Sequence, residues 1–417
     1  MSGDFTMPDS GFPAEFAAFV DFIDGLELHE AVSRVASKLN PLSSPVRALY
    51  RDRYFFHEHC ISITEGPTPF QLDVSNINAV RAASFIAGIN RVRRRLSPVA
   101  IPRFRNVIVG CLRPDRDIRQ LEHEIRSFVH FGQKGMQITL ADLEGHGRFD
   151  LDCRTKDTAF EVECKTVTQD TGAAIKTDLL VNLSEEFRRT VHRTPVTFGS
   201  GIFILTFCRA PDECRDLALT LRTALGSSSL PESPDGDFDL VFIPKPEWTK
   251  LVTSATPNEV RAALRDELID ASDHHFATKI GDKIIALALR PHKPNSLSEK
   301  VISVLKEGAD QCSGNHPSLV WLHLIGHAEA EFLKLAHFSM EGGGAGLNAI
   351  VAKALHPRAS STDRSHVHTI RFSAEAAEII QKPVLDEELL IRKARSLSGP
   401  CYDVPNPLCR FKGEIDF

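Results

Sequence analysis

Apolar residues recur at helical spacing through most of the first 115 residues. Phe16, Phe19, Phe22 and Ile23 predict one helix, and the segment from about Ser75 to Leu96 predicts another. Ser75 or Asn76 can cap the second helix, and Pro98 and Pro102 end it. The β-branched run 106–110 (Asn-Val-Ile-Val-Gly) predicts a short strand. Residues 1–115 are therefore predicted to be mainly helical.

The pattern changes between residues 117 and 226. The segment 117–131 carries apolar residues on one helical face, and strands are predicted at 136–140, 149–153 and 160–165. An amphipathic helix is predicted at about 174–192, then an apolar strand at 201–207 and a helix at about 211–225. The predicted order of elements is α-β-β-β-α-β-α.

Beyond a Ser-, Pro- and Gly-rich linker near 226–236, strands alternate with helices again. Strands are predicted at 240–243, 284–289, 319–324 and 367–372, and a helix at about 297–309. The 417 residues are thus predicted to form a mixed α/β protein of three parts. These are a helical arginine-rich region (1–115), a central domain (116–228) and an α/β region (229–417) whose role the patterns do not assign.

The formal net charge of −6 gives no indication of a nucleic-acid partner. Its distribution changes that conclusion, because residues 81–119 contain ten arginines against two aspartates, a local charge of +8. Guanidinium groups suit phosphate oxygens, and phosphate contacts supply much of the affinity for nucleic acids. Contacts to phosphates are predicted for Arg91, Arg93, Arg94, Arg95, Arg103 and Arg105. The alternative is that these arginines pair with acidic groups of the same chain.

The sequence also predicts a compartment. No basic segment followed by an apolar one opens the chain, and no apolar run approaches the ~20 residues that span a bilayer. The nine cysteines are scattered, with no C-x-x-C pair. We therefore expect a cytoplasmic protein with reduced thiols and no membrane partner.

Asp150, Glu163 and Lys165 are the candidate chemical groups. Side chains alternate across a strand, so Glu163 and Lys165 share one face, roughly 7 Å apart. A short turn joins their strand to that of Asp150, so the two strands should pair as a hairpin. Two carboxylates beside a lysine suit metal-assisted phosphodiester cleavage, in which hard oxygen ligands hold Mg²⁺ and the lysine orients water or stabilises charge.

Asp150 followed by Glu163-Cys164-Lys165 resembles the motif of the PD-(D/E)xK nuclease superfamily, and the α-β-β-β-α-β order resembles its core. The resemblance covers residues 117–226 and implies that Asp150 and Glu163 bind Mg²⁺ or Mn²⁺, with Lys165 as catalytic lysine. It also implies metal binding by the main-chain carbonyl of Cys164 and by a glutamate of the first helix, for which Glu124 is preferred to Glu122. Phe149 replaces the proline of the motif. Asp152 competes with Asp150 for the aspartate role, and Glu161 could assist Glu163.

The predicted function is metal-dependent hydrolysis of nucleic acid. The resemblance favours DNA over RNA and implies a restriction-like or phage-defence role. A homodimer and an activating partner protein remain open. The alternatives are a catalytically inactive nucleic-acid-binding module on the same fold and a protein-interaction scaffold.

Overall fold

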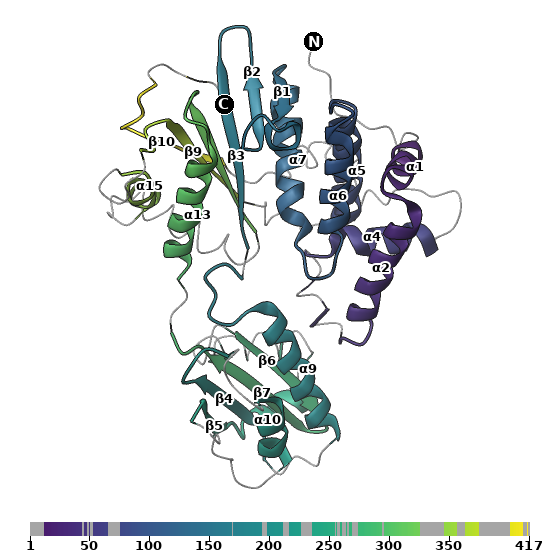
Figure 1. Cartoon of the computed structure of the whole chain (residues 1–417). Helices are drawn as coiled ribbons and strands as arrows, with labels where there is room; N and C mark the ends of the chain where they lie inside the picture. Colours follow the sequence, from purple (N-terminus) through teal and green to yellow (C-terminus); the bar gives the residue numbers. More distant parts are fainter. Residues whose placement is uncertain are drawn as a thin grey trace. The chain divides into compact units, whose positions relative to one another are not determined.

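In the computed structural model the chain divides into two compact units (Figure 1). It describes residues 12–43, 46–47, 50, 53–65, 76–168, 170–193, 198–211, 217–226, 236–254, 256, 259–260, 264, 267–268, 274–293, 296–325, 346–356, 363–374, 401–411 and 415. Unit 1 comprises residues 1–41, 50–171 and 297–417, and unit 2 comprises residues 42–49 and 172–296. The expected mixed α/β fold class is confirmed, since helices and two sheets occur together.

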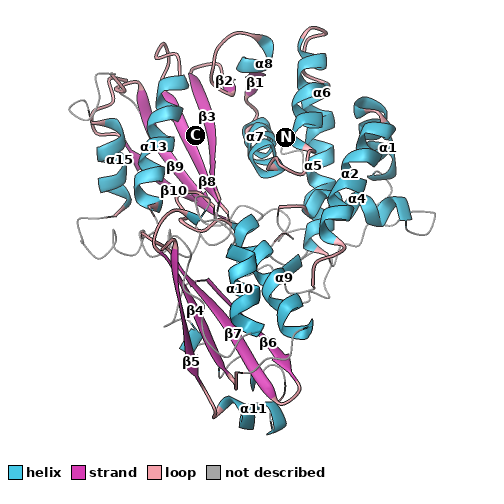
Figure 2. Ribbon diagram, turned by 60° about the horizontal axis from the view of Figure 1, so that its bottom comes forward, coloured by secondary structure: helices cyan, strands magenta, loops and turns pink. Residues whose placement is uncertain are grey.

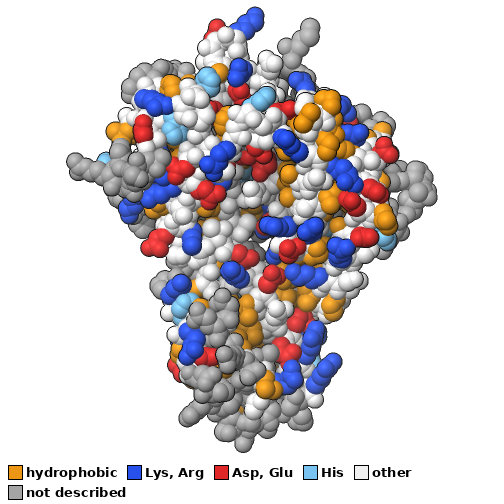
Figure 3. All heavy atoms as spheres, in the orientation of Figure 1, with side chains coloured by type: hydrophobic (Ala, Val, Ile, Leu, Met, Phe, Trp, Pro, Cys, Tyr) orange, Lys and Arg blue, Asp and Glu red, His pale blue; other side chains and the backbone are white. Residues whose placement is uncertain are grey.

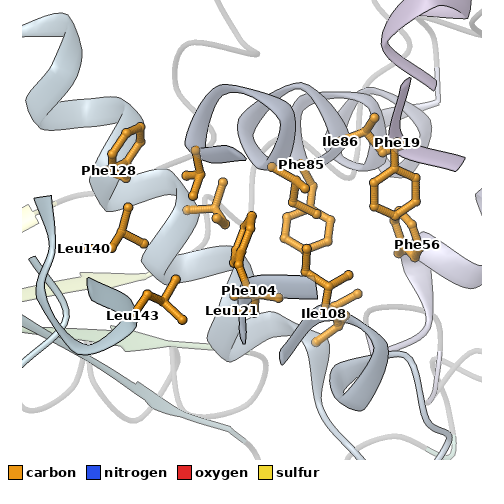
Figure 4. Packing of buried hydrophobic residues seen from close by; sticks show 14 of the residues in the cluster. Phe19, Phe56, Phe85, Ile86, Phe104, Ile108, Leu121, Phe128, Leu140 and Leu143 are labelled. Carbon is orange, nitrogen blue, oxygen red and sulfur yellow. The ribbon is translucent and has the colours of Figure 1, made fainter. Parts of the chain in front are cut away.

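Helices form the first part of unit 1, as expected. They are α1 (Phe12–Ile23), α2 (Gly25–Leu39), α4 (Phe55–Glu65), α5 (Ile77–Arg93), α6 (Ala100–Cys111) and α7 (Ile118–Gln133). The side chain of Asn76 caps α5, accepting from the backbone N–H of Asn78 and Ala79. Phenylalanines and aliphatic residues of these helices interlock in one core (Figure 4).

The strand predicted at 106–110 is wrong, because these residues belong to α6. Ala100, Phe104 and Ile108 recur every four residues and are buried, whereas Val107 is exposed. A β-branched run favours a strand only when alternate residues can be buried. Here the helical period over the longer segment decides the conformation.

A six-stranded sheet follows α7, in the order β1-β2-β3-β8-β9-β10. The strands are β1 (Gln137–Leu140), β2 (Leu151–Arg154), β3 (Ala159–Val167), β8 (Ser318–Leu324), β9 (Val367–Ala374) and β10 (Cys401–Pro405). The pairs β1–β2, β2–β3 and β9–β10 are antiparallel, while β3–β8 and β8–β9 are parallel. A four-residue helix, α8 (Ala141–Glu144), forms the corner between β1 and β2.

Helices cover both faces of this sheet. Apolar residues of α7 share a core with Phe160, Val162 and Cys164 of β3. Helices α13 (Leu297–Gln311) and α15 (Leu347–Leu355) share a second core with alternate residues of β8 such as Val320 and Leu322. Figure 2 shows α7 and α13 on opposite sides of β3. Side chains of β3 that point away from α7 therefore lie beneath α13.

Unit 2 has its own sheet, in the order β5-β4-β7-β6. The strands are β4 (Gly201–Phe207), β5 (Phe238–Pro244), β6 (His274–Ile280) and β7 (Lys283–Arg290). Helices α9 (Thr177–Arg193) and α10 (Leu217–Gly226) share a core with one face, and α11 (Trp248–Ser254) shares a core with the other.

This division corrects the expected domain boundaries 1–115, 116–228 and 229–417. The strand predicted to complete the core at 201–207 is β4 of the other sheet, and the parallel neighbour of β3 is β8. The order α-β-β-β-α-β does occur around one sheet, as α7-β1-β2-β3-α13-β8, with unit 2 inserted between β3 and α13. β4 and β8 are both almost wholly buried, and such a pattern shows that a strand is central without showing to which sheet it belongs.

None of the helices in the described residues is long and apolar enough to cross a membrane.

Candidate active site

Asp150 lies directly before β2, where β2 stops pairing with β3. The pairing of β2 with β3 begins at Leu151, which lies opposite Val162. The Oδ2 atom of Asp150 accepts a hydrogen bond from the backbone N–H of Cys164 at 2.7 Å. The motif aspartate is thus joined directly to the strand that carries the other two motif residues.

The backbone N–H and C=O groups of Cys164 point to the side of β3 on which Asp150 lies. Glu161 donates its N–H to Pro317, and Val167 accepts from Ile325, so the odd-numbered residues of β3 direct their backbone groups toward β8. In an extended strand the N–H and C=O of one residue point to the same side. The carbonyl of Cys164 therefore opens toward Asp150, while its thiol is buried against α7.

Glu163 and Lys165 share the face of β3 beneath α13, as the alternation predicts. Lys165 Nζ lies 2.9 Å from Glu163 Oε1 and 3.2 Å from Glu307 Oε1, and it also donates to the side-chain oxygen of Gln311. Three side chains thus hold the ammonium group of Lys165, two of them from α13.

Gly308 allows α13 to come this close. A Cβ atom at Gly308 would lie 3.4 Å from the Cγ atoms of Glu163 and Lys165, and 3.0 Å from Cγ1 of Val320. These distances leave no room for a larger side chain without movement of the helix. Gly308 therefore helps to enclose the candidate site.

One oxygen of Glu163 has no hydrogen-bond partner among the residues that the structure describes. The residue is 2% exposed, and this oxygen, Oε2, is buried. Buried carboxylate oxygens are normally paired, so an unpaired one calls for an explanation such as a missing water or ion.

The structure separates Glu124 from Glu122. Glu122 is buried and binds Arg81 through two hydrogen bonds of 2.7 and 2.6 Å, with Arg126 at 2.6 Å. Glu124 has no ion pair among the described residues, and its Oε1 accepts only a 3.5 Å bond from Gln120. The negative charges of Asp142 and Glu163 act on Glu124. Glu124, and not Glu122, is therefore the helix glutamate near the motif.

The rival carboxylates have other partners. Asp152 forms an ion pair of 2.7 Å with Arg154. Glu161 accepts from the backbone N–H of Ser313 at 2.8 Å, and from the hydroxyl of that residue. Asp150 and Glu163 are thus the aspartate and glutamate whose charges act on one another.

Burial raises the pKa of each carboxyl group near the motif, and repulsion between carboxylates adds to the change at Glu124, Asp150 and Glu163. Burial raises the pKa of Glu124 to about 8, helped by the charges of Asp142 and Glu163. Burial raises the pKa of Glu163 to about 7 although Lys165 opposes the change. The pKa of Asp150 is raised well above its usual value by burial and by the charges of Glu124 and Glu163. Asp142 is exposed, and partial desolvation of its carboxyl group raises its pKa as well.

Asp142 was not singled out from the sequence. It lies two residues beyond the end of β1, in a corner whose geometry no motif describes. The only sequence signal was an aspartate at the end of a predicted strand. Together with Asp150, Glu163 and Glu124 it forms what we term the carboxylate cluster.

The chemistry of the cluster fits a hard divalent cation. It supplies carboxylate oxygens, a carbonyl and an excess of negative charge, which Mg²⁺ and Mn²⁺ prefer. The unpaired Glu163 Oε2 is consistent with such a ligand. Within the described part of the chain, however, no three His, Cys, Asp or Glu side chains could hold a metal ion as they are placed. A cation would have to draw the carboxylates together and displace Lys165 from Glu163.

The predicted phosphate-binding arginines have different surroundings. Arg93, Arg94 and Arg105 contact the first two helices: Arg93 donates to Ala18, Arg94 pairs with Glu15, and Arg105 pairs with Glu27. On the face seen in Figure 3, basic and acidic side chains are intermingled. Arg94 and Arg105 therefore fit the expected alternative of pairing with acidic groups of the same chain, whereas Arg93 binds a backbone carbonyl.

The remaining three arginines lie on the same part of unit 1. Arg91 is half-buried and Arg95 is exposed. Arg103 is exposed and donates to the carbonyl of Leu143 at 3.2 Å, in the corner next to Asp142. Among the six predicted phosphate ligands, Arg103 is thus the one with a described hydrogen bond to the β1–β2 corner that carries Asp142.

Comparisons of this chain with protein families, with curated proteins and with solved structures gave no match.

Proposed function

We propose that this chain is a Mg²⁺- or Mn²⁺-dependent nuclease that hydrolyses phosphodiester bonds, with DNA as its substrate. The observation that carries the proposal is the carboxylate cluster around the ends of β2 and β3, with Lys165 beside it. One buried oxygen of Glu163 in this cluster has no partner in the described part of the chain. The arrangement α7-β1-β2-β3-α13-β8 supports it, because it resembles the core of the PD-(D/E)xK nucleases.

Asp150, Glu163, Glu124 and the carbonyl of Cys164 would hold the cation. When bound, it lowers the pKa of a coordinated water and neutralises charge on the phosphate. The N–H of Cys164 fixes the orientation of Asp150. Lys165 carries a positive charge that can stabilise the negative charge developing on the phosphate oxygens. Glu307 and Gln311 keep that charge at the edge of the cluster.

A cleavage assay tests this function. The purified chain is incubated with plasmid DNA, linear DNA and RNA in Mg²⁺, Mn²⁺ or EDTA, beside the variants Lys165→Ala, Asp150→Asn and Asp152→Asn. We expect metal-dependent cleavage of DNA that is lost in the first two variants. Asp152→Asn is the matched control, since Asp152 lies on the same hairpin but pairs with Arg154. Cleavage in EDTA, or cleavage that survives Lys165→Ala, would contradict the proposal.

One observation favours a second candidate, a nucleic-acid-binding module without activity. Lys165 is bound to Glu163, and the carboxylates do not converge on a ready-made metal site in the described residues. Such a module would bind DNA in the same assay without cutting it, in any metal.

A further inference from the structure

Strand β5 is an outer strand of the sheet in unit 2, and among the described residues its one neighbour is β4 (Figure 2). The N–H of Lys245 donates to the carbonyl of Ser200, and the carbonyl of Asp237 accepts from the N–H of the β4 side. The odd-numbered residues of β5 thus direct their backbone groups toward β4, because these groups alternate in direction along a strand. The N–H and C=O groups of the even-numbered residues point away from the sheet. An outer strand of this kind is a template for pairing with another strand.

The apolar face of the sheet extends onto β5 and meets solvent there. Val241 is 53% exposed and Ile243 is 38% exposed, and they lie on one face of the strand. Their partners on β4 are Ile204 and Ile202, which are buried in the core that α11 covers through Trp248. Two β-branched side chains therefore remain exposed side by side at the edge of this core.

An acidic and a basic residue flank this apolar pair on the same face. Asp239 lies two residues before Val241, is exposed, and forms no ion pair within the described part of the chain. Lys245 lies two residues after Ile243, and its ammonium group is 2.5 Å from Glu267. An ammonium group has three donors, so Lys245 can bind a second carboxylate.

The pattern of this face is complementary to itself in one antiparallel register. With a two-fold axis at Phe242, the apolar residues of two copies face each other, and Asp239 of each copy faces Lys245 of the other. Moving the axis by one residue places Asp239 opposite Ile243 or Glu247, and the ion pair is lost. Charge therefore selects a single register.

The backbone of β5 fits the same register. The outward N–H groups of Phe242 and Leu240 face the carbonyls of Phe242 and Pro244 of a second copy. Pro244 has no N–H, so the pairing ends at this residue. The odd-numbered side chains occupy the positions between hydrogen-bonded pairs, where side chains of opposite strands lie closer together.

We propose that two copies of this chain associate through β5, so that the sheet of unit 2 continues across a two-fold axis at Phe242. Main-chain hydrogen bonds join the copies, Val241 and Ile243 cover one another, and ion pairs of Asp239 with Lys245 fix the register. One strand from each copy makes a small contact, so the association is weak and reversible. It is independent of the proposed nuclease function.

Sedimentation velocity of the full chain from low to high micromolar concentration tests the inference. The wild type should form a dimer reversibly. Asp239→Lys and Lys245→Glu should each weaken the dimer at least tenfold, because each places like charges opposite one another. An equimolar mixture of the two variants should dimerise again, since the two altered positions then face each other and so do the two unaltered ones.

Val241→Lys should also prevent association, and Leu219→Lys is its matched control. Leu219 is 55% exposed and lies on α10, which shares a core with the opposite face of the sheet, so this variant should dimerise as the wild type does. Hydrogen exchange provides a second readout. The N–H groups of Leu240 and Phe242 should become protected as the concentration of the wild type rises, whereas those of β6, at the other end of the sheet order, should not.

A wild-type chain that stays monomeric at every concentration would overturn the inference. A dimer that survives Val241→Lys would overturn it too, because the contact would then lie elsewhere. The same holds if the two charge variants keep the circular dichroism spectrum of the wild type but their mixture stays monomeric. None of these results bears on nuclease activity, which the cleavage assay tests separately.

Discussion

Two glutamates on one helix, Glu122 and Glu124, should respond in opposite ways to the same substitution. Glu122 is 3% exposed and lies between Arg81, which is 5% exposed, and Arg126. Replacing Glu122 by Gln leaves these guanidinium groups without their counter-charge. Removing one partner of a buried ion pair costs about 3–5 kcal/mol. We therefore expect Glu122→Gln to destabilise the chain by about this amount.

Glu124→Gln should stabilise the chain. Its pKa of about 8 in the folded state lies above the ordinary 4.5. A carboxyl group whose folded pKa is raised stabilises the fold only below its unfolded pKa, and that stability is lost as the pH rises toward 8. At pH 7 the folded chain keeps this carboxyl group protonated although it ionises when unfolded, and this costs about 1–3 kcal/mol, from 1.36 kcal/mol per pH unit. Glutamine removes this cost.

Urea unfolding followed by circular dichroism, in EDTA at pH 7, measures both effects. Repeating it at pH 5 should leave the loss in Glu122→Gln and shrink the gain in Glu124→Gln, because the carboxyl group of Glu124 in the unfolded chain is then close to its own pKa of 4.5. If the two variants are destabilised equally, or if Glu122→Gln costs under about 1 kcal/mol, the assignment of the two glutamates is wrong.

Three further predictions concern other parts of unit 1. Burial lowers the pKa of His57 and of His123 to about 4, so these residues are neutral when folded. Each histidine should reduce stability by roughly 1–2 kcal/mol between pH 7 and 5, opposite in sign to the contribution of Glu124. Urea unfolding of His57→Gln and His123→Gln should show this fall removed, and variants with the same pH dependence as the wild type would contradict the prediction. Gly308→Val should crowd the face of β3 that carries Glu163 and Lys165, and should lower the free energy of unfolding in urea by about 1–3 kcal/mol. We expect DNA cleavage to fall more than tenfold. Unchanged activity would show that the packing of α13 does not position Lys165. Arg103→Ala should weaken DNA binding in fluorescence anisotropy and reduce the slope of log binding constant against log salt concentration by about 1. Arg105→Ala should lower the melting temperature and leave DNA binding unchanged, because Arg105 pairs with Glu27. Equal effects of the two variants on binding would refute the distinction.

The sequence predicted local structure better than it predicted which elements meet. The helix at 117–131 and the strands at 136–140, 149–153 and 160–165 lie within a few residues of α7, β1, β2 and β3. Hydrophobic periodicity reports burial along a short segment, and these elements are consecutive. The strand that completes their sheet is β8, about 150 residues further on, and periodicity carries no information on such a pairing.

The candidate site shows the same limit. Asp150, Glu163 and Lys165 could be proposed because a hairpin fixes their relative positions. Gln311, Gly308 and Asp142 could not, since their roles depend on how α13 and the β1–β2 corner pack. The arginine segment was predicted from its charge, but a sequence does not show which guanidinium groups other parts of the chain bind.

Unit 2 is inserted in the sequence between β3 and β8 of the six-stranded sheet, and this has a consequence for the order of folding. β3 and β8 must find each other across about 125 inserted residues, and a flexible connection of that length slows such a pairing. Within unit 2, however, the N–H of Ser296 donates to the carbonyl of Gly172 at 2.9 Å, which joins the two ends of the insertion. Once unit 2 has folded, it acts as a loop of only a few residues, which reduces the entropic cost of closure by about 3 kcal/mol. Lys165 and the α13 residues that bind it thus meet most readily after the inserted unit has formed, so a slow or damaged unit 2 should delay assembly of the site without altering any residue in it.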